Sequence, residues 1–261
     1  MSDGTSTFRV GEDSYDRFMG RYSAPLAAAF ADAVGVVPGQ RVLDVGCGPG
    51  ALTAELVRRL GADSVVAVDP SEPFAEACAR RNSGVDVRTA AAEELPFADA
   101  AFDVALAQLV VQFMADASTG VGEMRRVVAP GGVVDACVWD YDDGMRMLRL
   151  FWDAALAVDP SAPDEARRLR YGRRGELGEL LRSSRLAEVR EGALDVQTEY
   201  ASFADFWEPF TLGVGPAGAY CVALETERQA ALRDELRGRL GDPPGAFVLS
   251  ARAWYAIGRV P

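Results

Sequence analysis

Histidine and lysine are both absent from this sequence of 261 residues, so arginine supplies every basic side chain. The chain therefore cannot build a Ser-His-Asp or Cys-His nucleophile, a lysine Schiff base, a P-loop lysine or a histidine-ligated metal centre. If the chemistry needs a base, that base must be an aspartate, a glutamate, a tyrosine or a cysteine. No single catalytic residue can be named from the sequence.

Cysteine is scarce and long hydrophobic runs are missing. The four cysteines form no C-x-x-C pair and lie far apart, at Cys47, Cys78, Cys137 and Cys221. This spacing is typical of reduced thiols, and we expect no metal site. No apolar stretch is long enough for a membrane span, and the opening segment carries acids instead of the apolar core of a signal peptide. We therefore expect a cytoplasmic protein.

Negative charge dominates the composition, with a net charge of −12 at pH 7. An acidic body repels nucleic acid and anionic membrane surfaces. We therefore expect a small-molecule partner and neither a nucleic acid nor a membrane. One basic cluster, RRLRYGRR at residues 167–174, interrupts this pattern and is either a solvated helix face or a site for an acidic substrate or partner. The sequence does not indicate an oligomeric state.

The clearest motif is RVLDVGCGPG at residues 41–50. Its apolar half predicts a buried parallel strand, and residues 51–60, with leucine at every fourth position, predict a helix directly after the turn. Asp44 ends the strand. Glycines without a Cβ allow positive φ and close approach of a ligand to the main chain, and they stand at Gly46, Gly48 and Gly50.

The glycine spacing separates two kinds of nucleotide site. Dinucleotide folds use G-x-G-x-x-G, whereas this chain has D-x-G-x-G-x-G. A phosphate beside Asp44 would meet like charge, but a cationic or zwitterionic ligand would not. The next predicted strand, residues 64–68, runs into Asp69-Pro70, close to the offset of about 20 residues at which a nucleotide-binding unit places an acid on the ribose hydroxyls.

This pattern resembles the first motif of the class I S-adenosylmethionine-dependent methyltransferases, and Asp69 matches their ribose-binding acid. Two further stretches are similar to the family. AAAEELPF at residues 90–97, followed by FDVALA, resembles the adenine-contacting loop and fourth strand. EMRRVVAPGGVV at residues 123–134 resembles the next helix, turn and fifth strand. The resemblance covers about residues 40–139.

The resemblance implies S-adenosylmethionine as cofactor and assigns its contacts. It places Asp44, the three glycines and Asp69-Pro70 around the cofactor, with Gln108 facing the methionine part. Many relatives have an aspartate where this chain has Ala91, which leaves the adenine contact to Glu93 or to the backbone of Ala92 and Glu93.

The N-terminal segment YDRFMGRYS, residues 15–23, resembles an arm that folds over the cofactor in many small-molecule methyltransferases. Arg17 or Arg21 could pair with the cofactor carboxylate, because guanidinium and carboxylate match in a bidentate geometry. Arg21 is the preferred candidate, and a surface arginine remains an equal alternative.

After Trp139 the family motifs stop. Residues 144–158 predict an amphipathic helix that packs in the core or covers a substrate pocket. FADFWEPF at residues 203–210 predicts a local aromatic core or part of an acceptor pocket. Tyr141 and Trp207 are the candidate substrate residues of these segments.

The sequence thus predicts an α/β fold of the Rossmann-like methyltransferase type, with a mostly parallel seven-stranded sheet flanked by helices and a helical cap inserted after the fifth strand. We expect one domain: an arm and helix at 1–38, a cofactor-binding core at 39–139, a cap at 140–185, and the last strands and C-terminal helices at 186–261. The expected function is methyl transfer to a small molecule, mainly by proximity and without a His or Lys base. The alternative is a catalytically silent S-adenosylmethionine-binding regulatory or partner protein.

Overall fold

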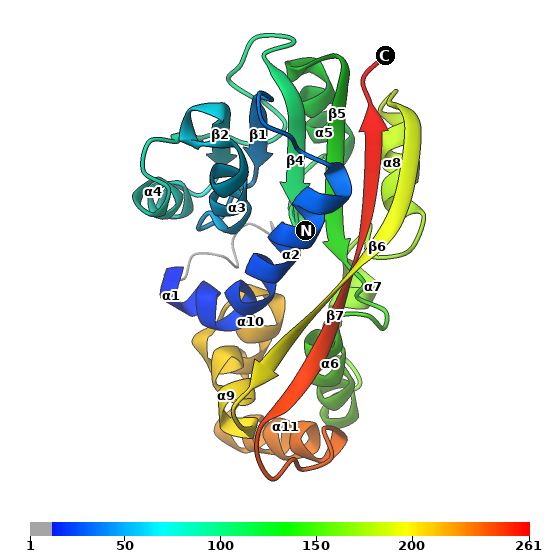
Figure 1. Ribbon diagram of the computed structural model, residues 1–261. Helices are drawn as coiled ribbons and strands as arrows, with labels where there is room; N and C mark the ends of the chain where they lie inside the picture. The colour runs from blue at the N-terminus through cyan, green and yellow to red at the C-terminus, as the bar shows by residue number, and fades with distance from the viewer. Residues whose placement is uncertain (1–11) are drawn as a thin grey trace.

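The computed structural model describes residues 12–261, so the first part of the predicted N-terminal arm lies outside the described residues. Its centre is one seven-stranded sheet with strand order β3-β2-β1-β4-β5-β7-β6 (Figure 1). All neighbouring strands pair in parallel except those next to β7, which is antiparallel to both β5 and β6. This arrangement confirms the predicted fold. The strands are β1 (Val42–Val45), β2 (Val65–Asp69), β3 (Asp86–Thr89), β4 (Phe102–Gln108), β5 (Val128–Trp139), β6 (Ala187–Tyr200) and β7 (Phe247–Arg259).

The central strands form because their residues, apart from Asp44 and Asp69, are apolar on both faces. Every residue of β1 and β2 is buried, as parallel strands covered by helices require. The strand order reverses between β1 and β4, where the connections leave in opposite directions. Ligands of such sheets bind outside the carboxyl ends of the strands at this reversal.

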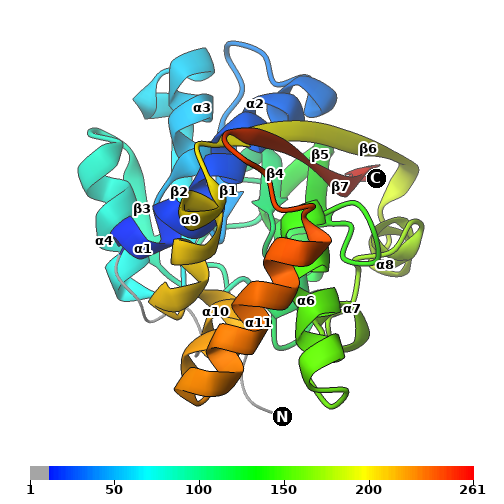
Figure 2. The same cartoon turned by 90° about the horizontal axis from the view of Figure 1, so that it is seen from below.

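Helices cover both faces of the sheet. In Figures 1 and 2, α2 and α3 lie together on one face, and α5 and α8 pack against each other and against the strands of the other half of the sheet. A short π-helical turn, Asp16–Gly20, joins α1 to α2. The helices outside the cap are α1 (Glu12–Tyr15), α2 (Arg21–Val34), α3 (Ala51–Leu60), α4 (Glu72–Arg81), α5 (Ala117–Val127) and α8 (Glu176–Ser183).

The cap is assembled from two separate stretches of chain. Helix α6 packs against α10 and α11, which follow β6 and precede β7 in the chain. The long strands β6 and β7 extend down to these helices (Figure 1). The predicted cap at 140–185 contains only part of this layer, because the helices that complete it come from residues 203–239. The cap helices are α6 (Arg146–Val158), α7 (Glu165–Arg168), α9 (Phe203–Trp207), α10 (Gly215–Ala223) and α11 (Thr226–Arg239).

Aromatic stacking fixes the two parts of the cap to each other. The rings of Phe151 on α6 and Phe210 are stacked with centroids 4.4 Å apart, and Phe206 meets Phe210 edge-on at 5.7 Å. Such pairs contribute about 0.5–1.5 kcal/mol each beyond the burial of their area. The aromatic cluster at 203–210 therefore builds a local core, one of its two predicted interpretations.

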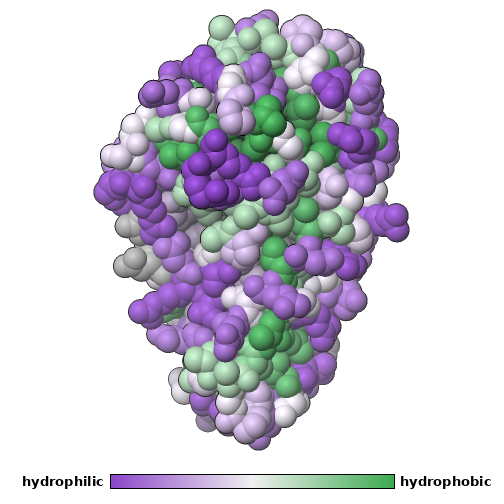
Figure 3. All heavy atoms as spheres, viewed as in Figure 1, coloured by the Kyte–Doolittle hydropathy of each residue, from purple (hydrophilic) through white to green (hydrophobic). Residues whose placement is uncertain are grey.

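Hydrophilic side chains cover most of the face shown in Figure 3, and its hydrophobic groups form separate patches. The exposed large hydrophobic residues among those described are Val37, Val222 and Val248. Within residues 12–261, no helix has the length and apolar character needed to cross a bilayer.

The interior holds one acidic side chain away from the carboxyl edge of the sheet. Asp135 on β5 is fully buried between Leu106 of β4 and Ile257 of β7, and neither carboxyl oxygen has a hydrogen-bond partner among the described residues. Burial raises its pKa well above the usual range, and the Ala136 backbone and the charge of Arg190 oppose this rise only in part. A buried polar group without a partner destabilises the folded state.

We expect Asp135→Asn to stabilise the fold at pH 7 by about 1 kcal/mol or more, because it removes an ionisable group whose charged form is disfavoured by burial. The folded-state pKa lies above the unfolded value of about 3.9, so the cost of Asp135 grows as pH rises. Denaturant unfolding at pH 4.5 and pH 7 should show a gain that is larger at pH 7. An identical pH dependence in both proteins would contradict the prediction.

Candidate functional site

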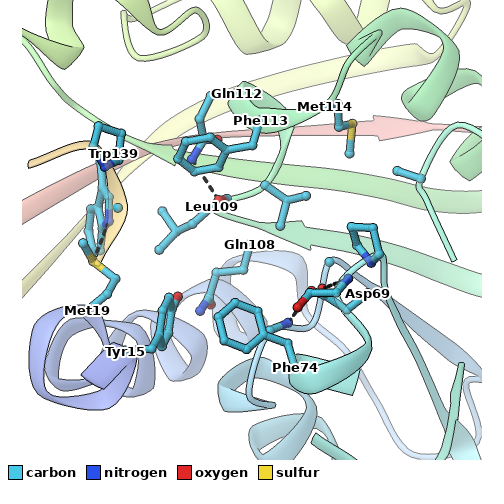
Figure 4. Close-up of a pocket in the computed structure, with 18 of the residues that line it drawn as sticks. Tyr15, Met19, Asp69, Phe74, Gln108, Leu109, Gln112, Phe113, Met114 and Trp139 are labelled. Atoms are coloured by element: carbon cyan, nitrogen blue, oxygen red, sulfur yellow. Dashed lines mark hydrogen bonds between the residues drawn. The ribbon is translucent and has the colours of Figure 1, made fainter. Parts of the chain in front are cut away.

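A cavity of about 750 Å³ lies at the carboxyl ends of the central strands and continues beneath the cap. At one end it is lined by the glycine loop after β1, the end of β2 and the start of α4. At the other end its walls come from β5, α6, α7 and α10. Figure 4 shows Asp69, Phe74 and Tyr15 together on one side, with Trp139 and Gln112 across the space. This location is the one expected for a ligand of an open α/β sheet.

The glycine loop leaves an open space where its middle glycine lines the cavity. Gly46, Gly48 and Gly50 all have positive φ, at 71°, 53° and 98°. A Cβ on Gly46 would collide with Val110, and one on Gly50 with Asn82. A Cβ on Gly48 would meet no atom within 4 Å. The outer glycines are therefore required by packing, and Gly48 is where a ligand can approach the main chain.

Asp69 fixes this loop to the end of β2. One carboxylate oxygen accepts a hydrogen bond from Gly48 N at 2.8 Å, and the other accepts one from Ser71 N at 2.8 Å. Burial raises the pKa of Asp69, and the two backbone donors counteract that rise. Each oxygen keeps a free lone pair, so two vicinal hydroxyls of a ligand can donate to the same carboxylate. Pro70 lines the cavity beside it.

Asp44 lies beneath the loop and does not itself line the cavity. Thr53 Oγ1 donates to one of its oxygens at 2.6 Å, and the other oxygen, Oδ1, is buried without a partner among the described residues. Burial raises the pKa of Asp44 to about 7. A nearby positive charge would favour the ionised carboxylate.

Gln108 adds a second unsatisfied acceptor, this one in the cavity wall. Its Nε2 donates to the carbonyl of Ser23 at 3.2 Å, and its buried Oε1 has no partner among the described residues. The charged side chains that line the described cavity are all acidic: Asp69, Glu93 and Glu165. This electrostatic setting suits a ligand with positive charge.

The loop after β3 supplies the side wall. Ala91, Ala92 and Glu93 all line the cavity, and Glu93 Oε1 also accepts a hydrogen bond from Asp116 N at 3.1 Å at the start of α5. With alanine at position 91, Glu93 is the only carboxylate that this loop presents to the cavity.

The N-terminal arm closes the cavity with different residues from those predicted. Tyr15 and Phe74 meet edge-on at 5.5 Å next to Asp69, and Met19 lies against Trp139, whose Nε1 donates to its sulfur at 3.2 Å (Figure 4). Sequence reasoning selected the arginines of this arm because charge is visible in a sequence. The apolar residues of the same motif are the ones that face the cavity.

The structure places Arg21 outside the cavity lining. Its guanidinium donates to both carboxylate oxygens of Asp205, at 3.0 and 3.3 Å, and lies over the ring of Tyr200 at 4.5 Å. Arg17 pairs with Glu208 at 2.9 Å on the surface. These ion pairs join the N-terminal helices to the cap, and the Arg21 guanidinium is bonded to Asp205.

The two predicted substrate residues differ in position. Tyr141 is buried and lines the cap end of the cavity, with its hydroxyl accepting a hydrogen bond from Gln112 Nε2 at 3.4 Å. Trp207 does not line the cavity and packs against Phe210, with ring centroids 6.3 Å apart. The cap end also contains Glu165, which sequence reasoning missed because nothing local distinguishes it from the other acids of the chain.

The comparisons with known proteins agree with this geometry. Residues 43–134 match the family described as a methyltransferase domain. A ubiquinone biosynthesis O-methyltransferase of Rhizobium etli is 43% identical over 100 residues, which cover 37% of this chain and 40% of that enzyme. The matched part spans less than half of the curated relatives that align with it.

Solved structures match over almost the whole chain. An S-adenosylmethionine-dependent methyltransferase from Thermotoga maritima superposes with a TM-score of 0.56 at 18% identity, covering 95% of this chain and 96% of that one. The [4+2]-cyclase SpnF superposes at 0.55 with 21% identity, covering 90% and 80%. At such identities the likeness concerns the fold. Residues 43–134 therefore match a methyltransferase domain, and the chain as a whole shares the fold of these solved structures.

The cavity fits S-adenosylmethionine, the cofactor of the methyltransferase from Thermotoga maritima that shares this fold. The open space over Gly48 admits a ligand against the main chain, and Asp69 offers two acceptor oxygens. The unsatisfied oxygens of Asp44 and Gln108 and the acidic lining complement a ligand that carries an ammonium and a sulfonium.

We expect Gly48→Val to weaken S-adenosylmethionine binding by about 100-fold or more, because the valine side chain would fill space that the ligand needs. Gly35→Val is the matched control, since Gly35 also has positive φ (74°), has no atom within 4 Å of its Cβ position and lies far from the cavity. Both variants should lose similar stability. Isothermal titration calorimetry would detect the difference, and equal affinities would exclude Gly48 from the binding site.

Proposed function

We propose that this protein transfers a methyl group from S-adenosylmethionine to a small-molecule acceptor. The observation that carries this proposal is one continuous cavity with two different ends. The end at Gly48 and Asp69 suits the cofactor. The end at Tyr141 and Leu148 lies under the cap and is mainly apolar, so it suits a second molecule.

Each cofactor contact in this proposal rests on a feature of this chain. Asp69 accepts from the ribose hydroxyls, and Asp44 and Gln108 favour the ammonium group. Pro70, Ala92 and Glu93 border the adenine. The main chain at Gly46 and Gly48, which both line the cavity, forms the floor, and the packing around Gly46 and Gly50 supports it. The cofactor carboxylate has no arginine partner in the described lining, so we leave Arg21 out of the site.

The chemistry needs little from the protein beyond placement. When bound, S-adenosylmethionine supplies a methyl group that its sulfonium already activates. The side chains of this chain would align the acceptor and exclude water, and the walls formed by the half-buried Met19 and the buried Trp139 and Leu148 serve that purpose. This agrees with a chain that lacks histidine and lysine.

The proposal includes a cytoplasmic location and a small molecule, without nucleic acid, as the acceptor. Four free, buried cysteines support a reducing compartment, and the net charge of −12 disfavours nucleic acid. The relatives' substrates belong to those proteins, because less than half of each is matched.

The second candidate function is binding of S-adenosylmethionine without transfer of its methyl group. Two observations favour it. Ala91 removes a carboxylate from the adenine loop, and the [4+2]-cyclase SpnF shares this fold. The fold alone therefore does not establish methyl transfer.

Binding and turnover measured side by side separate these functions. We expect wild-type protein to bind S-adenosylmethionine and to release S-adenosylhomocysteine when incubated with a metabolite pool. Asp69→Ala should weaken binding by about 1.5–3 kcal/mol, because a charged acceptor of two hydroxyls is lost. Binding without any product would favour the silent protein. Unchanged affinity in a folded Asp69→Ala variant would contradict the ribose assignment.

The affinity for S-adenosylmethionine should also depend on pH. Because burial raises the pKa of Asp44 to about 7, the ionised fraction of this group increases between pH 6 and pH 7.5. If its carboxylate favours the ammonium, affinity rises several-fold over this range, before the ligand amine titrates near about 7.7–8. Asp44→Asn should flatten this rise. The same rise in the variant would show that another group, such as Asp69, produces it.

A further inference from the structure

The polar groups at the cap end of the cavity have more hydrogen-bond acceptor positions than the neighbouring residues have donors to fill. They are Gln112, Tyr141 and Glu165, on the 3₁₀ turn Val111–Phe113, the loop after β5 and helix α7. All three are buried. A buried acceptor without a donor is costly, so such groups indicate a ligand that supplies donors.

Glu165 is the centre of this group. It is 4% exposed, and the only hydrogen bond that its carboxylate receives from residues 12–261 comes from Trp152 Nε1, at 2.7 Å. Arg149, whose charge acts on Glu165, forms its ion pairs with other residues. Arg149 donates to both oxygens of Asp164 at 3.2 Å and to Asp153 at 2.9 Å. Glu165 therefore faces the cavity without a cation bonded to it.

Gln112 adds to this shortage of donors. Its Nε2 donates to the carbonyl of Leu109 at 2.8 Å and to the Tyr141 hydroxyl, so the amide nitrogen is fully used. Its Oε1 is buried and has no partner among the described residues. Gln112 points toward the centre of the cavity from the side opposite Tyr15 (Figure 4).

The walls around these acceptors are apolar and flat. Trp139, Leu148 and Phe18 line the same end, and Phe18 is held edge-on against Phe210 at 5.4 Å. Such walls bind an aromatic or otherwise compact apolar body through burial of its surface. They offer no cation for an anionic group, since no arginine lines the described cavity.

We propose that Glu165, with Gln112, selects the acceptor by accepting a hydrogen bond from a hydroxyl or ammonium group carried on a compact apolar body. This inference rests on the proposed function and adds the chemical class of its acceptor. Carboxylates and phosphates are rejected, because they would bring a second negative charge beside Glu165.

Burial raises the pKa of Glu165 to about 7. The groups that act on Glu165 are the Trp152 indole, which lowers the pKa, Asp164, which raises it, and Arg149, which lowers it. A bound ammonium or hydroxyl would stabilise the carboxylate form and lower the pKa further.

The test uses matched probes and protein saturated with S-adenosylhomocysteine, so that no turnover occurs. 4-Methylphenol and benzylammonium carry a donor, 4-methylanisole carries none, and benzoate is anionic. We expect wild-type protein to bind the two donor probes about tenfold or more tightly than the ether and benzoate, as a hydrogen bond to a charged group allows. Calorimetry or ligand-observed NMR would measure these affinities.

Glu165→Gln keeps the shape of the side chain and should reduce the affinity for both donor probes by about tenfold, leaving the ether unchanged. Glu179→Gln, on the exposed face of α8, is the matched control and should change nothing. In wild-type protein the indole N–H signal of Trp152 should titrate near pH 7, and each donor probe should move the midpoint downward.

Wild-type protein with equal affinity for the phenol and its ether would overturn this inference, even if the variant does not fold. An equal loss for all probes in Glu165→Gln would also overturn it, because that result indicates a structural role. If wild-type protein binds neither S-adenosylmethionine nor its product, the proposed function fails as well. If the protein binds the cofactor normally but shows no preference for the donor probes, only the assignment of Glu165 is rejected, and the proposed function stands.

Discussion

The hydrogen bond from Gly48 N to Asp69 is the contact on which the rest of the site depends. Gly46 N and Cys47 N donate to the carbonyl of Val68 in the same region, so the glycine loop is attached along the end of β2. This attachment leaves the main chain at Gly48 facing open space. Without it the loop would have no fixed position relative to Asp69.

The second constraint is electrostatic and follows from the absence of basic residues in the described cavity lining. Asp69 and Glu165 stand at its two ends, and Asp44 lies beneath the loop. Burial raises the pKa of each of these carboxyl groups. In the proposed function, the cationic groups of the cofactor would relieve this cost at Asp44 and Asp69, and a donor group of the acceptor would relieve it at Glu165. Asp135 is also buried, but it does not line the cavity, so a ligand bound there cannot offset its cost.

No arginine lines the described cavity, and several arginines form ion pairs around it. Arg21 holds Asp205 of the cap, Arg81 holds Asp16 of the N-terminal helices at 2.7 Å, and Arg149 holds Asp164 beside Glu165. These pairs join elements that are distant in sequence and set how the arm and cap lie over the cavity. Exposed pairs contribute little stability individually, so their main effect here is on geometry.

The sequence by itself determined the strand, glycine turn and helix around Asp44, and the second strand that ends at Asp69, because these features depend on neighbouring residues and on backbone conformation. It also indicated the amphipathic helix α6. Only the tertiary structure decided that Arg21 pairs with Asp205, that Trp207 packs away from the cavity, and that Glu165 lines it. Each of those outcomes depends on partners far away in the chain, and local pattern carries no information about which distant side chains meet.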